Sequence, residues 1–266
     1  MTASPRPVVS GAFPSTSSGT AMDLTLQEVP TTSRGAATAQ DLVDMFAEDP
    51  LTRGQGRIVS GKIIAMALDI IESYLQSNRS GVGAVSSSLC ESFFLPNQSE
   101  TIRARLVEQH LLCDQKEQED LKPASYYIDR LVRSFSRLLL CHQVAPNYYV
   151  VFEVVWRSER GRLLKVWDGV GAWTNQRTPK EIPEVKLLLD VLFEGDEIPV
   201  FLSELGEAPC GTRASGPFSF MTMSSLVMGV RLKGWRATDE GVARNYTWGC
   251  LMKGRLLSPP LQKLGV

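Results

Sequence analysis

The spacing of apolar residues divides the chain into a helical part and a β-rich part. From about residue 39 to residue 145, apolar side chains recur every three or four positions, as on one face of an α-helix. After Pro146 the period becomes two, which is typical of β-strands. Helices first and strands later indicate an α+β fold, with an N-terminal helical part packed on antiparallel β-hairpins.

Four helices are predicted in the first part. The strongest follows Ser60 and carries one apolar stripe, made of Ile63, Ile64, Ala67, Ile70, Ile71, Tyr74 and Leu75. A shorter helix is predicted near residues 39–49, and two more over residues 98–113 and 122–142.

The second part predicts two hairpins around a helix. In residues 147–169, the alternating residues Val150, Phe152, Val154 and Trp156 predict a strand that is covered on both sides. A helix over 178–195, a short strand over 197–202 and a loop over 206–217 follow. Residues 227–252 are interpreted as a second hairpin that turns at 239–241.

The first 38 residues differ from the rest in composition. They are rich in Ser, Thr, Pro, Gly and Ala, with few large apolar side chains to offset the entropy of ordering. We therefore expect a disordered tail over residues 1–38. Residues 39–266 are expected to form one α+β domain, with a helical part over 39–145 and a β-rich part over 146–266.

Composition favours an intracellular, cytoplasmic protein, with a nuclear or peripheral membrane location left open. The chain has 266 residues, of which 43% are hydrophobic, yet it has no run of about 18 apolar residues and no secretory signal pattern. Its five cysteines are scattered and odd in number, which fits reduced thiols.

The segment GQGRIVSGKII, residues 54–64, nearly matches a phosphate-binding loop. Gly56, Gly61 and Lys62 fit that pattern, but Ile63 stands where a magnesium-binding hydroxyl is needed. We interpret Ser60 as the cap of a core helix. A weak anion site formed by Arg57, Gly61 and Lys62 at that helix start remains a hypothesis.

Metal and nucleophile motifs are sparse. His110, Cys113, Cys141 and His142 could supply four zinc ligands, but Cys113 and Cys141 fall at the ends of predicted antiparallel helices, about 27 Å apart. Cys210 is the one cysteine flanked by a glycine-rich loop, and no histidine motif supports it as a nucleophile. We therefore predict no cofactor, no metal and no enzymatic activity.

The C-terminal hairpin is the candidate binding surface. Residues 220–266 hold seven basic residues against two acidic ones, although the whole chain carries a net charge of −1. Pairing across the predicted turn places three cations and three aromatic rings on one side. These residues are Arg231, Lys233, Trp235, Arg244, Tyr246 and Trp248.

These features favour a non-enzymatic structural or interaction protein that self-associates. A polar tail, an α+β body and a basic C-terminal face are similar in layout to the matrix proteins of negative-strand RNA viruses. That resemblance is one of layout, and it implies self-association and binding to protein partners or to an anionic membrane surface.

Three alternatives remain open. The first is a host-directed accessory or adaptor protein that uses its tail and a sheet edge to bind another protein. The second is an RNA-binding protein that stacks bases on the C-terminal hairpin. The third is a nucleotide enzyme that uses the loop ending at Lys62.

Overall fold

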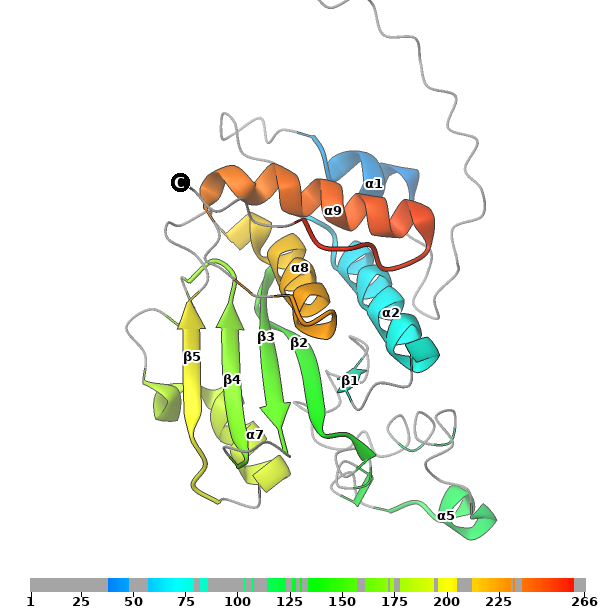
Figure 1. Cartoon of the computed structure of the whole chain (residues 1–266), viewed down its shortest axis with the longest axis vertical. Coiled ribbons are helices and arrows are strands. Elements are labelled where there is room, and N and C mark those ends of the chain that lie inside the picture. The colour runs from blue at the N-terminus through cyan, green and yellow to red at the C-terminus, as the bar shows by residue number, and fades with distance from the viewer. Residues whose placement is uncertain are drawn as a thin grey trace, which may run out of the picture.

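A mixed five-stranded β-sheet forms the centre of the molecule (Figure 1). The computed structural model describes residues 38–47, 57–78, 82–85, 103, 107, 114–122, 126–127, 130, 134–156, 161–171, 173–174, 178–193, 196–204, 212–230, 232 and 236–260. Residues 1–37 of the predicted tail over 1–38, and most of the predicted helix over 98–113, therefore lie outside the described residues.

The strands follow one another across the sheet in chain order. The three central strands pair antiparallel, and each outer strand runs parallel to its neighbour. In spatial order the strands are β1 (Val82–Val85), β2 (Arg137–Ala145), β3 (Tyr148–Val155), β4 (Leu163–Asp168) and β5 (Val200–Glu204).

The predicted hairpin in residues 147–169 is confirmed as the pair β3 and β4. Seven of the eight residues of β3 are buried, so this strand is covered on both faces as its sequence predicts. The predicted strand over 197–202 corresponds to β5, which begins three residues later.

Helices cover both faces of the sheet. On one face, α8 (Ser215–Val227) contacts β3 and packs against α2 (Gly61–Asn78) and α9 (Glu240–Lys253), and α1 (Ala39–Asp44) lies next to α9 (Figure 1). On the other face, α7 (Pro183–Phe193) packs against the sheet, and the rings of Phe193 and Trp156 lie 4.4 Å apart. Short 3₁₀ turns precede three of these helices: η1 (Pro179–Glu181), η2 (Thr212–Ala214) and η3 (Ala237–Asp239).

Helix α2 forms where its apolar stripe predicts it. Ile63, Ile64, Ala67, Ile71 and Leu75 are buried, and the other two stripe residues are partly buried against the same core. The backbone N–H of Lys62 donates to the Ser60 side chain at 3.3 Å, so Ser60 satisfies a donor of the first turn. Ser60 therefore caps a core helix as predicted, while residues 54–56 of the near-miss phosphate loop lie outside the described residues.

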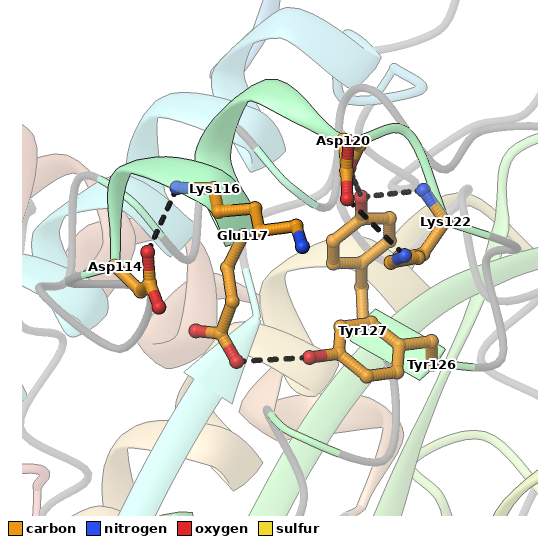
Figure 2. A network of polar contacts seen from close by, with 7 residues as sticks. All are labelled: Asp114, Lys116, Glu117, Asp120, Lys122, Tyr126 and Tyr127. Carbon is orange, nitrogen blue, oxygen red and sulfur yellow. Dashed lines mark hydrogen bonds and ion pairs between the residues drawn. The ribbon is translucent and has the colours of Figure 1, made fainter.

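A polar network anchors the short helix α5 (Gln115–Glu119) (Figure 2). The Tyr127 hydroxyl donates to the carbonyl of Asp120 at 2.9 Å and accepts from the backbone N–H of Lys122 at 2.7 Å. The Tyr126 hydroxyl donates to Glu117 at 3.0 Å, and this bond raises the pKa of Tyr126. Two tyrosines adjacent in sequence therefore fix both the helix and the turn after it.

The predicted helix over 122–142 is wrong in its last third. Residues 137–142 belong to β2, where Leu138, Leu139, Leu140 and Cys141 are all buried. This apolar run fits a helix or a strand covered on both faces equally well, and tertiary pairing with β1 and β3 decides for the strand.

The predicted second hairpin over 227–252 is also wrong. Helix α8 ends at Val227, and residues 240–253 form α9. The first twelve residues of α8 are all buried, five Ser and Thr residues among them, so the helix has no exposed polar face that its sequence could reveal. Its start also replaces part of the predicted loop over 206–217.

The α+β class is confirmed, but the sheet is mixed and is not a set of antiparallel hairpins. In the part of the chain that the structure describes, residues 39–145 supply β1 and β2 and residues 146–266 supply β3, β4 and β5, so the two parts share one sheet. Within the described residues, no helix has the length and apolarity needed to cross a membrane.

Candidate functional site

Three elements meet at one end of the sheet and bring polar side chains together. They are the start of β3, the end of β4 and the start of α8. We call this set the β3/α8 site, and it consists of Asn147, Tyr148, Tyr149, Asp168 and Ser215.

Asp168 is the fully buried carboxylate of the site. One oxygen accepts the Tyr148 hydroxyl at 2.7 Å and two backbone N–H groups, those of Val170 and Gly171. The other accepts the backbone N–H groups of Trp173 and Thr174 and the Thr174 hydroxyl. Six donors therefore fix the loop after β4 around one side chain.

The two tyrosines at the start of β3 point to opposite faces of the sheet, because side chains alternate along a strand. The Tyr148 hydroxyl bonds Asp168 and also accepts the backbone N–H of Trp173 at 3.1 Å. The backbone of Tyr149 bonds to α8: the Tyr149 carbonyl accepts a hydrogen bond from the Ser219 hydroxyl at 2.9 Å.

Ser215 is the first residue of α8 and is fully buried. Its hydroxyl donates to the carbonyl of Asn147 at 2.9 Å and accepts the backbone N–H of Tyr149 at 3.1 Å. Asn147 has a positive φ of 58°, which turns its carbonyl within reach of α8. The helix start is thus attached to the backbone of β3 on both sides of Tyr148.

A close approach between α2 and α8 fixes the position of Ser215. A Cβ atom on Gly216 would lie 2.7 Å from the Ile64 side chain, so only glycine lets α8 start so near α2.

The Ser215 hydroxyl lies at a helix start, beside the strand that carries Tyr148, whose phenol bonds the buried Asp168. In acyl-transfer sites the nucleophile is hydrogen-bonded to a base that a carboxylate orients, whereas the Ser215 hydroxyl here donates to the Asn147 carbonyl. In the β3/α8 site the side chains are the Ser215 hydroxyl, the Tyr148 phenol and Asp168, with neither a thiol nor an imidazole among its five residues.

The two described cysteines lie elsewhere. Cys141 is in the middle of β2, and burial raises the pKa of its thiol from the ordinary 9.0 to about 12. Cys250 is buried in α9, and burial raises its pKa as well. Both thiols are therefore protonated and shielded at neutral pH.

The zinc hypothesis gains no ligand set from the structure. His142 follows Cys141 on β2, where successive side chains point to opposite faces. Cys113 and His110 lie outside the described residues, as does Cys210. Within the described part of the chain, no three His, Cys, Asp or Glu side chains group closely enough to hold a metal ion.

The six residues of the predicted C-terminal surface do not share one exposed face. Arg231, Lys233 and Trp235 lie outside the described residues. Arg244 is buried in α9, where it binds Glu240 and donates to the carbonyls of Met45 and Arg57 at 2.7 Å each. The predicted register failed because residues 240–253 form a helix.

Tyr246 and Trp248 pack inside or against the fold. The Tyr246 hydroxyl donates to the carbonyl of Leu257 at 2.8 Å, and burial raises the pKa of this phenol. Trp248 is partly buried and meets the Phe46 ring edge-on at 5.5 Å. A role for Trp248 in binding a partner stays a prediction.

The three residues of the predicted weak anion site, Arg57, Gly61 and Lys62, lie around the start of α2. Arg57 pairs with Asp44 at 2.7 Å, and Lys62 is exposed on the first turn of α2. A Cβ atom on Gly61 would lie 2.9 Å from the Tyr149 hydroxyl, so this glycine lets α2 approach β3. Anion binding there stays a prediction.

Sequence reasoning missed the β3/α8 site. Its visible signals were short: Asp168 and Gly169 follow a predicted strand, and Ser215 and Gly216 stand at the end of a predicted loop. Nothing in either pair shows that it meets the other, because the contact depends on α8 being a helix rather than part of a loop and a strand.

Comparison with known proteins shows which solved structures share this fold. No family model and no curated protein matches the sequence. The Ulp1 protease domain in complex with SMT3, the yeast ortholog of SUMO, matches with a TM-score of 0.53 at 9% identity, covering 80% of this chain and 81% of that one. Ulp1 with its catalytic cysteine oxidised to a sulfinic acid matches with a TM-score of 0.51 at 10% identity, covering 82% and 84%.

These matches correct the functional prediction. A non-enzymatic structural protein similar to viral matrix proteins is wrong, and so is the prediction of no enzymatic activity, because the matched domains are proteases. Self-association, an anionic membrane surface and RNA gain no support as partners. The chain has the fold of the SUMO protease Ulp1.

Proposed function

We propose that this chain acts on a SUMO-like protein and holds it against the β3/α8 site. The observation that carries the proposal is the match, over 80% of this chain, to the Ulp1 protease domain in complex with a SUMO ortholog. Protein partners were expected from the sequence, and the fold supports a partner of this class.

The β3/α8 site has the rigidity that recognition needs. Asp168 fixes the loop after β4, and Ser215 fixes the start of α8 to β3, so the backbone around the site is held before a partner arrives. Between these anchors, the β2–β3 turn carries the exposed Pro146 and the half-exposed Asn147. Asn147 is therefore the accessible side chain of the site, and Pro146 borders it.

Calorimetric titration of the full-length chain with SMT3 tests the proposal. We expect binding with a Kd of about 1–100 μM, corresponding to roughly 5.5–8 kcal/mol. Ubiquitin is the comparison partner, and weaker binding of ubiquitin than of SMT3 would show a preference of the chain for SUMO-like proteins. The absence of SMT3 binding at millimolar concentrations would overturn the proposal.

The variant Asn147→Gly tests whether SMT3 contacts the side chain of Asn147. Glycine accepts the positive φ at this position, so the change removes a side chain without straining the turn. It should weaken SMT3 binding severalfold, while the matched surface change Glu119→Gln in α5 should not. Equal affinities of both variants and the wild type would place the contact elsewhere.

A further inference from the structure

Three apolar side chains form a row on the surface where the turn after α1 meets α9 (Figure 1). Phe46 and Met252 are 44% and 51% exposed, and Trp248 is partly buried. We call Phe46, Trp248 and Met252 the α1/α9 ridge. Neighbouring exposed apolar side chains of this kind mark a surface that another segment covers.

The spacing along the α1/α9 ridge follows from the geometry of α9. Arg244, Trp248 and Met252 are four residues apart, so they lie on one side of the helix. Arg244 donates to the carbonyl of Met45, and the ring of Trp248 meets that of Phe46 at 5.5 Å, so this side faces the end of α1. Met252 lies one turn beyond Trp248, about 6 Å along the axis. Apolar side chains therefore follow one another about every 6 Å.

The end of the α1/α9 ridge at Met252 is positively charged. Lys253 and Arg255 are exposed there, and neither side chain pairs with a carboxylate in the part of the chain that the structure describes. At the other end, Asp44 is paired with Arg57 at 2.7 Å. A ligand with an acidic residue near one end thus matches this ridge in charge.

A segment of the chain itself has the matching pattern. Residues 22–26 read Met-Asp-Leu-Thr-Leu, and among residues 1–37 this is the one place where three large apolar residues alternate with polar ones. In an extended segment, every second side chain lies on the same side, about 6.6 Å apart. This spacing is close to that of the α1/α9 ridge, and the second residue of the segment is acidic.

The connection to the folded part of the chain is long enough. Leu26 is twelve residues before Thr38, which caps α1, so the link spans up to about 40 Å. The six-residue helix α1 adds only about 9 Å before the turn that carries Phe46. With Leu26 at Phe46 and Met22 at Met252, the acidic residue lies at the positively charged end.

We propose that residues 22–26 dock on the α1/α9 ridge of the same chain. Their three apolar side chains lie along the ridge, and Asp23 lies beside Lys253 and Arg255. The segment thereby keeps an apolar surface from contact with other proteins. This docking does not depend on the chain acting on a SUMO-like protein.

Limited digestion of the full-length chain with chymotrypsin, followed by mass spectrometry, tests the docking. Met252→Asp should speed cleavage after Leu24 and Leu26 at least fivefold, because the new carboxylate removes an apolar contact and repels Asp23. The matched control is Val242→Asp, which changes a 44% exposed apolar residue at the other end of α9 and should leave the wild-type rate. Circular dichroism checks that both variants are folded.

A charge exchange tests the placement of the acidic residue. Lys253→Glu with Arg255→Glu should speed the same cleavages at least threefold, and adding Asp23→Lys should slow them again, because the pair is restored with opposite signs. Free peptides of residues 18–30, with and without Asp23→Lys, correct for the preference of the protease itself.

Three results would overturn the proposal. The first is equal cleavage of the wild type and Met252→Asp, and the second is a charge-exchanged chain that is cleaved as fast as Lys253→Glu with Arg255→Glu. The third is protection that appears only at high chain concentration, because the segment would then come from a second copy.

Discussion

Asp168 shows how one side chain determines the shape of the β3/α8 site. Its carboxylate accepts four backbone N–H groups and two hydroxyls, all within the loop after β4 or from Tyr148. The sequence signals a turn after Trp167, but it cannot show that a tyrosine twenty positions earlier completes the cluster. Long-range polar contacts of this kind follow from the fold and not from local pattern.

Asp168→Asn should destabilise the protein by about 2–5 kcal/mol. The amide has one acceptor oxygen and an NH₂ group that would face backbone donors, so buried N–H groups lose their partner. Urea denaturation measures the effect, and Asp114→Asn at the N-cap of α5 is the control, expected within about 0.5 kcal/mol. If the urea midpoint of Asp168→Asn equalled that of the wild type, the carboxylate of Asp168 would not stabilise the fold as described.

Arg244→Met should cost about 3 kcal/mol and release the N-terminal segments. The guanidinium joins α9 to the carbonyls of Met45 and Arg57, and its removal leaves both acceptors and Glu240 without it. Hydrogen exchange should accelerate in residues 38–47 and 57–60. The exposed Arg255→Met is the control, and unchanged exchange in Arg244→Met would contradict this role.

Cys141 should make stability fall as pH rises above about 9. In the unfolded chain the thiol titrates near its ordinary value of 9.0, but burial raises the folded pKa to about 12, so between these values the folded state binds more protons. Cys141→Ala should therefore lose stability less steeply from pH 9 to 11. Denaturation midpoints across this range measure it, and parallel pH profiles would rule out the effect.

At the scale of elements, the regular spacing of apolar residues predicted α2 and β3. The stripe of α2 and the alternation of β3 both have the predicted form. It failed for β2, whose apolar run over residues 138–141 fits a helix or a strand, and for α8, whose Ser and Thr side chains are buried together with its apolar ones. Because α8 was not predicted, the second hairpin was predicted wrongly and the position of Ser215 was missed.

The contact between α2 and α8 predicts opposite effects for two glycines near helix starts. Gly216→Ala should destabilise by about 1–3 kcal/mol, because the new methyl group meets Ile64. Gly241→Ala in α9 meets nothing within 4 Å and should stabilise by up to about 1 kcal/mol. Thermal unfolding of both variants measures the difference, and equal shifts would contradict the close packing of α8 on α2.

At the scale of the whole molecule, the α+β class was predictable and the function was not. The β3/α8 site joins residues as far apart as Asn147 and Ser215, 68 positions along the chain. Composition and charge pointed instead to the C-terminal residues, of which Arg244 and Tyr246 are buried. The likeness to Ulp1 became visible only when the folded structure, with its mixed sheet, was compared with solved structures.

Hydrogen exchange of the full-length chain with and without saturating SMT3 tests the central claim most directly. If the β3/α8 site holds a SUMO-like protein, exchange should slow at residues 145–149, 168–171 and 212–216, and should be unchanged in α5. Protection confined to other surfaces, or an exchange pattern that SMT3 leaves unaltered at every residue, would contradict the account.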